Sequence, residues 1–298
     1  MPKLCLCFVF NHPYEKNIPK LKEIFGNRFT TIRFLSPFSK SKDEQIIPVF
    51  ETSVHFQGYF AQAYHQLPQD CDYYVFCGDD LILNPKFDEN NLIESIGCQD
   101  AAYIKYLNPV WEHSFAWHKF EDCNGFPPPN CVVPYFQFLP QRKDLIRRYD
   151  KFGIKYRNLG LHNFRGIHQR GLTYERVLKG LIFLMRNRLR RYINFPLIEG
   201  YSDLIIIPKP WLERFCYYCG VFAAMNLWVD AAVATSMVLA CDKIIQEKDH
   251  GFKGVELWGT DQVTPEKKYD LDFKKLLDDF PIQQLYLHPV KLSKWNFS

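Results

Sequence analysis

Two adjacent aspartates, Asp79 and Asp80, follow an apolar stretch of the chain, and Gly78 directly precedes them. Carboxylate oxygens are the hard ligands that Mg²⁺ and Mn²⁺ prefer, and a metal held there could stabilise a diphosphate leaving group. The glycine would let a substrate approach the backbone closely. Glycine and aspartate are also common in turns, so Gly-Asp-Asp could simply be a turn. These residues alone leave both interpretations open, a metal–diphosphate site and a turn.

The C-terminal stretch LYLHPVKLSKWNFS supplies further groups that a metal–diphosphate site needs. His288 follows a short apolar run, and its neutral imidazole could ligate the metal. Lys291 and Lys294 come a few residues later, and a lysine amine can neutralise a diphosphate as a point charge. A lone histidine is usually not a ligand, and lysines near a C-terminus are usually solvated. Together with the acid pair, however, these groups favour the metal interpretation.

The elements that must position these residues alternate along the first part of the chain. Apolar runs of strand length alternate with segments of helical periodicity, in the order strand 4–10, helix 16–29, strand 30–38, helix 58–67 and strand 72–78. This order predicts an α/β fold with a mixed, mostly parallel sheet flanked by helices.

Polar residues follow three of these strands. Asn11 and His12 follow the first, Pro37 ends the second, and Asp79 and Asp80 follow the third. Because ligands of open α/β sheets bind beyond the carboxyl ends of the strands, we expect all these residues at one edge.

The second half of the chain is less regular. Residues 105–170 are rich in Pro, Trp, Phe and His, which is typical of loops that build a substrate pocket. Residues 174–192 form a basic amphipathic helical pattern, 202–208 predict a strand, and 220–241 predict a buried helix. The basic pattern fits either an ordinary exposed helix or peripheral contact with an anionic membrane surface.

Composition narrows the class of protein. The net charge of +4 is small, and no aromatic-interleaved basic module is present, so we expect no nucleic-acid partner. The ten cysteines are irregularly spaced, with one C-x-x-C at Cys216 and Cys219, which favours buried free thiols and a reducing, cytoplasmic location. No apolar stretch is long enough for a membrane span, and the N-terminus lacks a signal-peptide cleavage site.

The usual nucleotide and hydrolase motifs are absent. The sequence has no G-x-G-x-x-G, no G-x-x-x-x-G-K-[ST], no G-x-S-x-G and no H-E-x-x-H. The acid pair therefore remains the main catalytic signal.

From residue 4 to 295 the chain resembles nucleotide-sugar-dependent glycosyltransferases of the GT-A fold, of the type that builds bacterial surface glycans. Their D-x-D motif matches CGDDLIL, with Gly78 at the first position and Asp80 at the position that binds metal. Asp79 takes the middle position and would contact the sugar nucleotide. The resemblance implies that the VFNHPY segment lines the nucleotide pocket through Asn11 and His12.

The tail is similar to the H-x-x-G-x-x-K-P-W end of glycogenin-like and bacterial lipooligosaccharide galactosyltransferases, with Lys291 in place of the glycine and no proline. This similarity implies that His288 joins Asp80 in binding Mn²⁺ or Mg²⁺. It also implies that Lys294, with help from Lys291, contacts the donor diphosphate.

GT-A enzymes also carry an acid at the start of a helix, after a glycine loop, and Gly220 and Asp230 occur in that order. In inverting members this acid deprotonates the acceptor hydroxyl. Asp230 could instead accept hydrogen bonds from buried backbone groups. Asp203 is the rival candidate for the base, and Glu199 is a weaker candidate. The tail favours a retaining reaction and Asp230 an inverting one, so the stereochemistry stays open.

These observations predict one GT-A-like catalytic domain over 1–298, with an irregular and helical acceptor-side insertion at about 105–195. It would transfer a sugar from a nucleotide-diphosphate donor, with UDP expected, to a glycan or lipid-linked glycan. A sugar nucleotidyltransferase is an alternative, although it would need a Gly-rich basic loop where the chain has NHPYEKNIPK. A catalytically inactive glycan-binding protein is the other alternative.

Overall fold

The structure is a computed structural model that describes residues 2–110, 123, 126, 137–156, 178, 182, 195–258, 261 and 263–297. The strands are β1 Leu4–Val9, β2 Ile32–Pro37, β3 Ile46–Val49, β4 Tyr73–Gly78, β5 Ile82–Leu83, β6 Ala102–Ile104, β7 Asn108–Pro109, β8 Ile198–Glu199, β9 Leu204–Pro208, β10 Ile244–Ile245, β11 Lys253–Glu256 and β12 Gln284–His288. The helices are α1 Ile18–Phe25, α2 Gln57–Ala63, α3 Leu92–Ser95, α5 Arg142–Lys151, α7 Lys209–Ala224, α8 Val229–Ala240, α9 Val263–Lys268 and α10 Phe273–Asp278.

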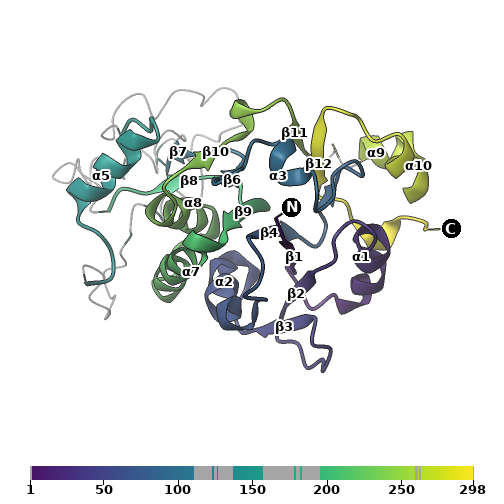
Figure 1. The fold of residues 1–298 in the computed structure, drawn as a ribbon, viewed down its shortest axis with the longest axis horizontal. Helices are drawn as coiled ribbons and strands as arrows, with labels where there is room; N and C mark the ends of the chain where they lie inside the picture. Colours follow the sequence, from purple (N-terminus) through teal and green to yellow (C-terminus); the bar gives the residue numbers. More distant parts are fainter. Residues whose placement is uncertain are drawn as a thin grey trace.

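The central sheet has the strand order β10-β6-β9-β4-β1-β2-β3 (Figure 1). Its neighbouring strands pair in parallel, except that β9 runs antiparallel to both β4 and β6. The predicted mixed, mostly parallel α/β sheet flanked by helices is therefore confirmed. The short strand β3 was missed by the sequence analysis, because its pattern IIPV contains a proline.

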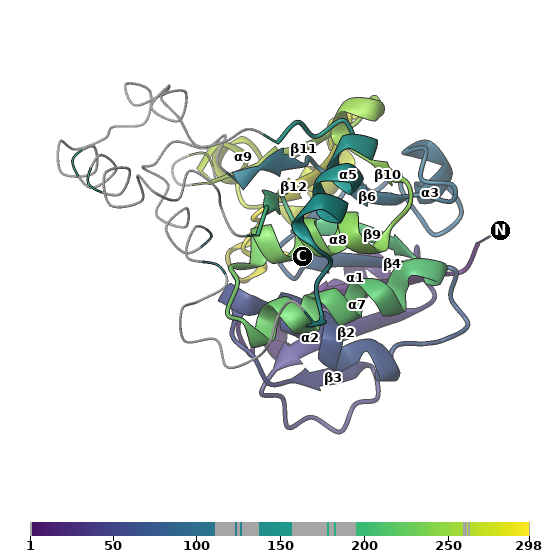
Figure 2. The same cartoon turned by 90° about the vertical axis from the view of Figure 1, so that its left-hand side faces the viewer.

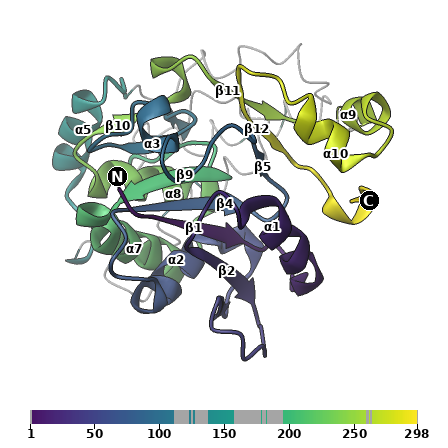
Figure 3. The ribbon, with the colours of Figure 1, turned by 45° about the vertical axis from the view of Figure 1, so that its right-hand side comes forward.

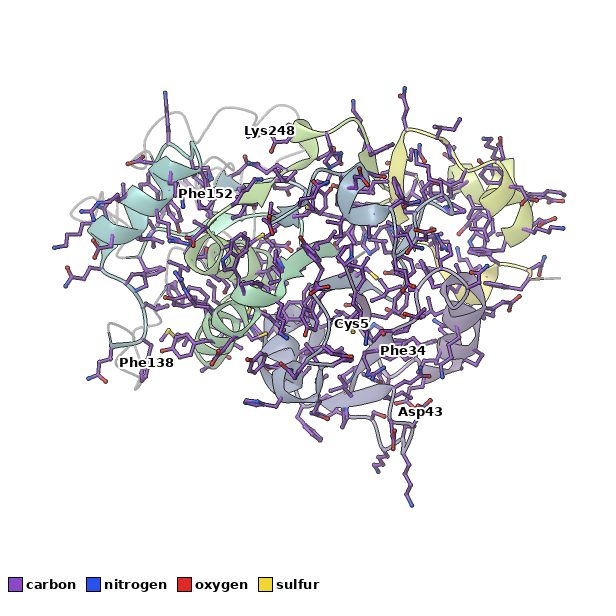
Figure 4. The ribbon with its side chains drawn as sticks, viewed as in Figure 1. Cys5, Phe34, Asp43, Phe138, Phe152 and Lys248 are labelled. Carbon is purple, nitrogen blue, oxygen red and sulfur yellow. The ribbon has the colours of Figure 1, made fainter. Side chains whose placement is uncertain are left out.

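Alternating residues of the central strands face two separate cores. In β1, Cys5 and Cys7 face the core formed with α2, α7 and α8, whereas Leu6 and Phe8 face the core formed with α1. Figure 2 shows α2, α7 and α8 on one side of the sheet, and Figure 4 shows Cys5 deep inside the molecule. Because both faces are covered, the strands are continuous apolar runs, as expected for buried parallel sheets.

The predicted helix at 220–241 is in fact two helices, so that prediction is wrong in its boundaries. Helix α7 ends at Ala224, and Asn226 then adopts a left-handed conformation with φ of +53°, which asparagine tolerates better than most residues. Helix α8 begins at Val229. None of the helices in the described ranges is long and apolar enough to cross a membrane.

A second sheet, in the order β11-β12-β5, is built from the C-terminal part of the chain and the residues just after Asp80. The backbone N–H of Val290 donates to the carbonyl of Asp80 at 2.7 Å. Figure 3 shows this sheet beside α9 and α10, next to the central sheet. The fold therefore brings the end of β12 against the Gly-Asp-Asp segment.

The basic segment at 174–192, apart from Leu178 and Ile182, lies outside the described residues, as does most of the insertion predicted at about 105–195. Peripheral membrane contact and the insertion therefore stay predictions.

Candidate functional site

The carboxyl ends of β1, β2 and β4 lie at one edge of the central sheet because these strands are parallel. The backbone N–H of Asp79 donates to the Val9 carbonyl at 3.1 Å. The Asp79 carboxylate accepts hydrogen bonds from the Asn11 backbone and the Asn17 side chain. Asp79 is therefore a buried acid, 8 % exposed, that holds the loop after β1 against the end of β4.

Asp80 and His288 meet at the junction of the two sheets. The Asp80 Oδ1 atom lies 2.9 Å from Nε2 of His288. The His288 side chain is 2 % exposed, and the Asp80 side chain is 25 % exposed. A buried imidazole thus faces a carboxylate that solvent can reach. A small ligand at this edge of the central sheet could therefore contact the pair.

Gly78 leaves the space that this pair occupies. A Cβ atom at residue 78 would lie 3.1 Å from Oδ1 of Asp80 and 3.5 Å from Nε2 of His288. The backbone N–H of Gly78 also donates to the Asp203 carbonyl at 3.0 Å, which ties the end of β4 to β9. The missing first acid of the D-x-D pattern therefore has a steric reason, since a side chain there would crowd Oδ1 of Asp80 and would contact His288 at an ordinary van der Waals distance.

The second ring nitrogen of His288 faces groups from the segment before β9. The Tyr201 hydroxyl lies 2.6 Å from Nδ1 of His288, and a carboxylate oxygen of Asp203 lies 3.8 Å from the same atom. The ring of Trp258 stands nearly perpendicular to the imidazole, at 5.3 Å between centroids. These contacts hold the imidazole plane in place.

Three carboxylates act on this one imidazole. Burial opposes protonation of His288, but the hydrogen bond with Asp80 and the charge of Asp203 outweigh it, so the pKa of His288 is raised. Burial, with the charge of Asp80, raises the pKa of Asp79 to about 7, against hydrogen bonds that lower it. Burial also raises the pKa of Asp203, although His288 opposes this. The site therefore concentrates negative charge away from water.

A divalent cation fits this charge and geometry. Two ligand atoms at right angles on an octahedral Mg²⁺-sized ion are about 3 Å apart, close to the 2.9 Å between Asp80 and His288. Among the described residues no three His, Cys, Asp or Glu side chains form a ready-made metal cage. The protein would thus supply two ligands and leave the other positions to diphosphate oxygens and water, which is common for Mg²⁺.

The remaining predicted site residues lie in different surroundings. Asp230 is in the first turn of α8, where its Oδ1 atom accepts a hydrogen bond from Ser202 at 2.8 Å. Lys294 forms an exposed ion pair with Glu266 at 2.9 Å. His12 and Lys291 are exposed, and Glu199 is buried in β8.

The predicted glycine loop before Asp230 is wrong. Gly220 lies inside α7, where a Cβ atom would meet the Cβ of Ala61 at 3.1 Å. Its role is to let α7 approach α2 closely, a packing reason for glycine that a pattern of residue types does not distinguish from a loop.

The sequence analysis missed Tyr201, Trp258 and Lys105. The Lys105 amine donates to Glu256 at 2.7 Å and to the Gly254 carbonyl at 2.9 Å. The amine also lies 5.2 Å from the centre of the Tyr201 ring. No motif marks these residues, which follow β6, precede β9 and follow β11.

Other clusters of polar or reactive groups have structural explanations. The nine described cysteines are buried, and eight of them, including Cys216 and Cys219 in α7, are free thiols. A cavity of about 420 Å³ between α5, α7 and α8 is lined with basic side chains. Its Arg148 and Arg214 donate hydrogen bonds to carbonyls at the end of α8, so they stabilise that helix terminus.

No protein-family model and no curated protein matches the sequence. Among solved structures, the mannosyltransferase Ktr4p from S. cerevisiae is similar at 11% identity with a TM-score of 0.39, over 84% of this chain and 70% of that one. Core-mannan synthase A from Aspergillus fumigatus, in a Mn/GDP form, is similar at 10% identity with a TM-score of 0.33, over 84% and 73%. At this level of similarity neither structure assigns a substrate or a residue role to this chain.

Replacing Gly78 with aspartate would restore the acid that the D-x-D pattern has at this position. We expect Gly78→Asp to weaken Mn²⁺ binding by about tenfold or more, because a Cβ 3.1 Å from Oδ1 of Asp80 crowds a proposed metal ligand. Gly78→Ala should have a smaller effect in the same direction. Calorimetric titration with Mn²⁺ measures both, with Gly251→Asp as the control because a Cβ there meets nothing within 4 Å. Tighter Mn²⁺ binding by Gly78→Asp would contradict this interpretation.

Replacing Asp79 with asparagine tests the buried charge. The folded state holds the Asp79 proton up to a pKa of about 7, against the ordinary aspartate pKa of 3.8, so the metal-free wild type loses stability as the pH rises between these values. Asp79→Asn removes this loss but also one hydrogen-bond acceptor. We therefore expect the variant to be more stable than wild type by about 1–2 kcal/mol at pH 8, with no advantage near pH 4.

Urea denaturation with EDTA across this pH range measures the difference, and Asp150→Asn, at an exposed position of α5, is the control. An equal loss of stability in Asp79→Asn at both ends of the range would show that the carboxylate is not a buried charge.

Proposed function

We propose that the chain is a metal-dependent glycosyltransferase that moves a sugar from a nucleoside-diphosphate donor to a hydroxyl of a glycan or lipid-linked glycan. The observation that carries this proposal is the approach of Asp80 and His288 to 2.9 Å at the carboxyl edge of the parallel sheet. Gly78 leaves room for this pair, and ligands of such sheets bind at this edge.

The loop after β1 is the candidate nucleotide pocket. Asp79 holds the backbone of Asn11, and His12 next to it is exposed. We propose UDP as the first nucleotide to test, and GDP as the second. Lys294 would turn from Glu266 to the diphosphate, with Lys291 beside it. An exposed ion pair such as Lys294–Glu266 contributes little stability and is readily exchanged.

The cation proposed here is Mn²⁺ or Mg²⁺, held by Asp80 and His288. A bound divalent cation would offset the negative charge that develops on the diphosphate as it leaves. The chain's own contribution is to keep the two ligands about 3 Å apart and to shield His288 from water, since its side chain is almost fully buried.

Asp230 is the proposed base for the acceptor hydroxyl in an inverting reaction. Its Oδ1 atom accepts a hydrogen bond from Ser202, which orients the carboxylate at the start of α8. A general base must lie within hydrogen-bond reach of the proton that it removes. The acceptor would then occupy the space between Asp230 and the metal.

We further propose that the enzyme works in a reducing, cytoplasmic compartment, supported by the free, buried thiols of eight of the described cysteines. Contact of the segment 174–192 with the inner face of a membrane would bring it to a lipid-linked acceptor for polysaccharide biosynthesis.

Thermal denaturation with metal and nucleotide tests the metal site. We expect Mn²⁺ and a nucleoside diphosphate together to raise the melting temperature of the wild type, because both bind only the folded state. Asp80→Ala should lose this shift, whereas Asp150→Ala should keep it. A screen of UDP- and GDP-linked sugars should then show metal-dependent donor hydrolysis. No metal-dependent shift with any nucleoside diphosphate would remove the support for this function and favour the inactive glycan-binding alternative.

The role of Asp230 is tested by separating binding from turnover. We expect Asp230→Asn to lower kcat for sugar transfer by about 100-fold or more, while the affinities for Mn²⁺ and nucleotide stay within about twofold of wild type. Proton NMR of the product gives the anomeric configuration, and inversion is expected. Retention of configuration, or full activity of Asp230→Asn, would rule out this role.

A further inference from the structure

The second nitrogen of His288 is held by a connected set of polar groups. The Tyr201 hydroxyl lies 2.6 Å from Nδ1 of His288. A carboxylate oxygen of Asp203 lies 3.8 Å from the same nitrogen, and Asp203 and the Trp258 indole both lie next to the Tyr201 hydroxyl. Tyr201 itself is only 8 % exposed, so water competes little for these contacts.

The direction of these hydrogen bonds follows from counting protons. A tyrosine hydroxyl has one proton to donate and lone pairs to accept with, an ionised carboxylate only accepts, and an indole N–H only donates. With the Nε2 lone pair given to a cation, the neutral imidazole carries its proton on Nδ1 and donates it to the Tyr201 oxygen, 2.6 Å away. The Tyr201 proton can then point to Asp203, whose carboxylate lies 3.8 Å from the same ring nitrogen.

We propose that Asp203 and Tyr201 form a hydrogen-bonded relay that keeps the neutral His288 protonated on Nδ1, with the lone pair of Nε2 directed at the metal position beside Asp80. Asp203 is then a positioning residue that acts through Tyr201, and the base for the acceptor remains Asp230. This inference rests on the proposed function, because the metal position belongs to it.

The opposite side of the imidazole supports this direction. Nε2 of His288 and Oδ1 of Asp80 lie 2.9 Å apart, so without a cation they share a hydrogen-bonding proton. A cation that takes the place of this proton needs the Nε2 lone pair, which leaves the imidazole proton on Nδ1. Histidines that bind metals commonly donate their other N–H to a carboxylate, which fixes the tautomer. Here the carboxylate of Asp203 does so through the phenol of Tyr201.

Neighbouring side chains hold the ring of Tyr201 in place. The ring of Tyr201 stacks on that of Tyr286 with an interplanar angle of 2° and 6.4 Å between centroids. The Lys105 amine, which donates to Glu256 at 2.7 Å, lies 5.2 Å from the centre of the Tyr201 ring. A cation over an aromatic face is attracted to it. The hydroxyl of Tyr201 therefore has little freedom to turn away from His288.

The test compares Mn²⁺ affinity between two matched tyrosine variants. Tyr201→Phe removes the centre of the relay. Tyr103→Phe removes a buried hydroxyl that has no hydrogen-bond partner within the described residues. We expect Tyr201→Phe and Asp203→Asn to weaken Mn²⁺ binding by about 10–100-fold, and Tyr103→Phe to leave it within about twofold of wild type. Calorimetric titration measures the affinities, and circular dichroism confirms that each variant is folded.

Nitrogen-15 NMR of the Mg²⁺-loaded protein gives a second readout that a purely structural role would not change. The His288 ring signals, identified by their loss in His288→Gln, should show a protonated Nδ1 in wild type and a mixture of tautomers in Tyr201→Phe.

The outcomes separate the relay from the proposed function. If wild type binds Mn²⁺ and both relay variants bind it equally well, the relay is wrong and the glycosyltransferase proposal stands. If Asp203→Asn abolishes sugar transfer with unchanged Mn²⁺ affinity, Asp203 is the base and the relay is overturned. If wild type binds neither Mn²⁺ nor Mg²⁺, both proposals fail together.

Discussion

The contact between Asp80 and His288 is the constraint on which the rest of the site depends, because it joins residues 208 positions apart in the chain. It exists only where the central sheet and the second sheet meet. The chain leaves β4 at Gly78, turns through the two acids and enters β5, which pairs with β12 directly before His288. The Gly-Asp-Asp segment is therefore both a turn, closed by the Leu81 N–H on the Gly78 carbonyl at 3.1 Å, and the centre of the site. The two interpretations that the sequence left open are compatible.

The electrostatics of this junction oppose folding. Asp79, Asp80 and Asp203 gather around one imidazole, and like charges removed from water destabilise the folded state. A chain selected for stability alone would place apolar side chains at such a junction. Its retention of buried acids agrees with a site that gains free energy when a cation binds, since functional sites commonly break the rules that stabilise the surrounding fold.

The part of the site that could be predicted from sequence is the part that follows parallel strands. Apolar runs identified β1, β2 and β4, and their parallel order placed Asn11 and Asp79 at one edge. The antiparallel insertion of β9 between β4 and β6 carried no signal, because a buried strand has the same apolar pattern in either direction. Tyr201 was missed for this reason. The position of Gly78 against His288 was also out of reach, since His288 comes from the other end of the chain.

The two acids that the sequence analysis treated as rivals occupy different electrostatic surroundings. Asp203 faces the imidazole, so its charge acts on a metal ligand, and it lies in hydrogen-bonding range of a buried tyrosine. Asp230 faces Ser202 from the first turn of α8, where the N-terminal end of a helix favours a negative charge. An acid that must gain and lose a proton in each cycle cannot also hold a ligand tautomer constant. In the proposed mechanism Asp203, just before β9, and Asp230, in α8, would divide these tasks, so that one small edge of the sheet could bind a cation and still accept a proton.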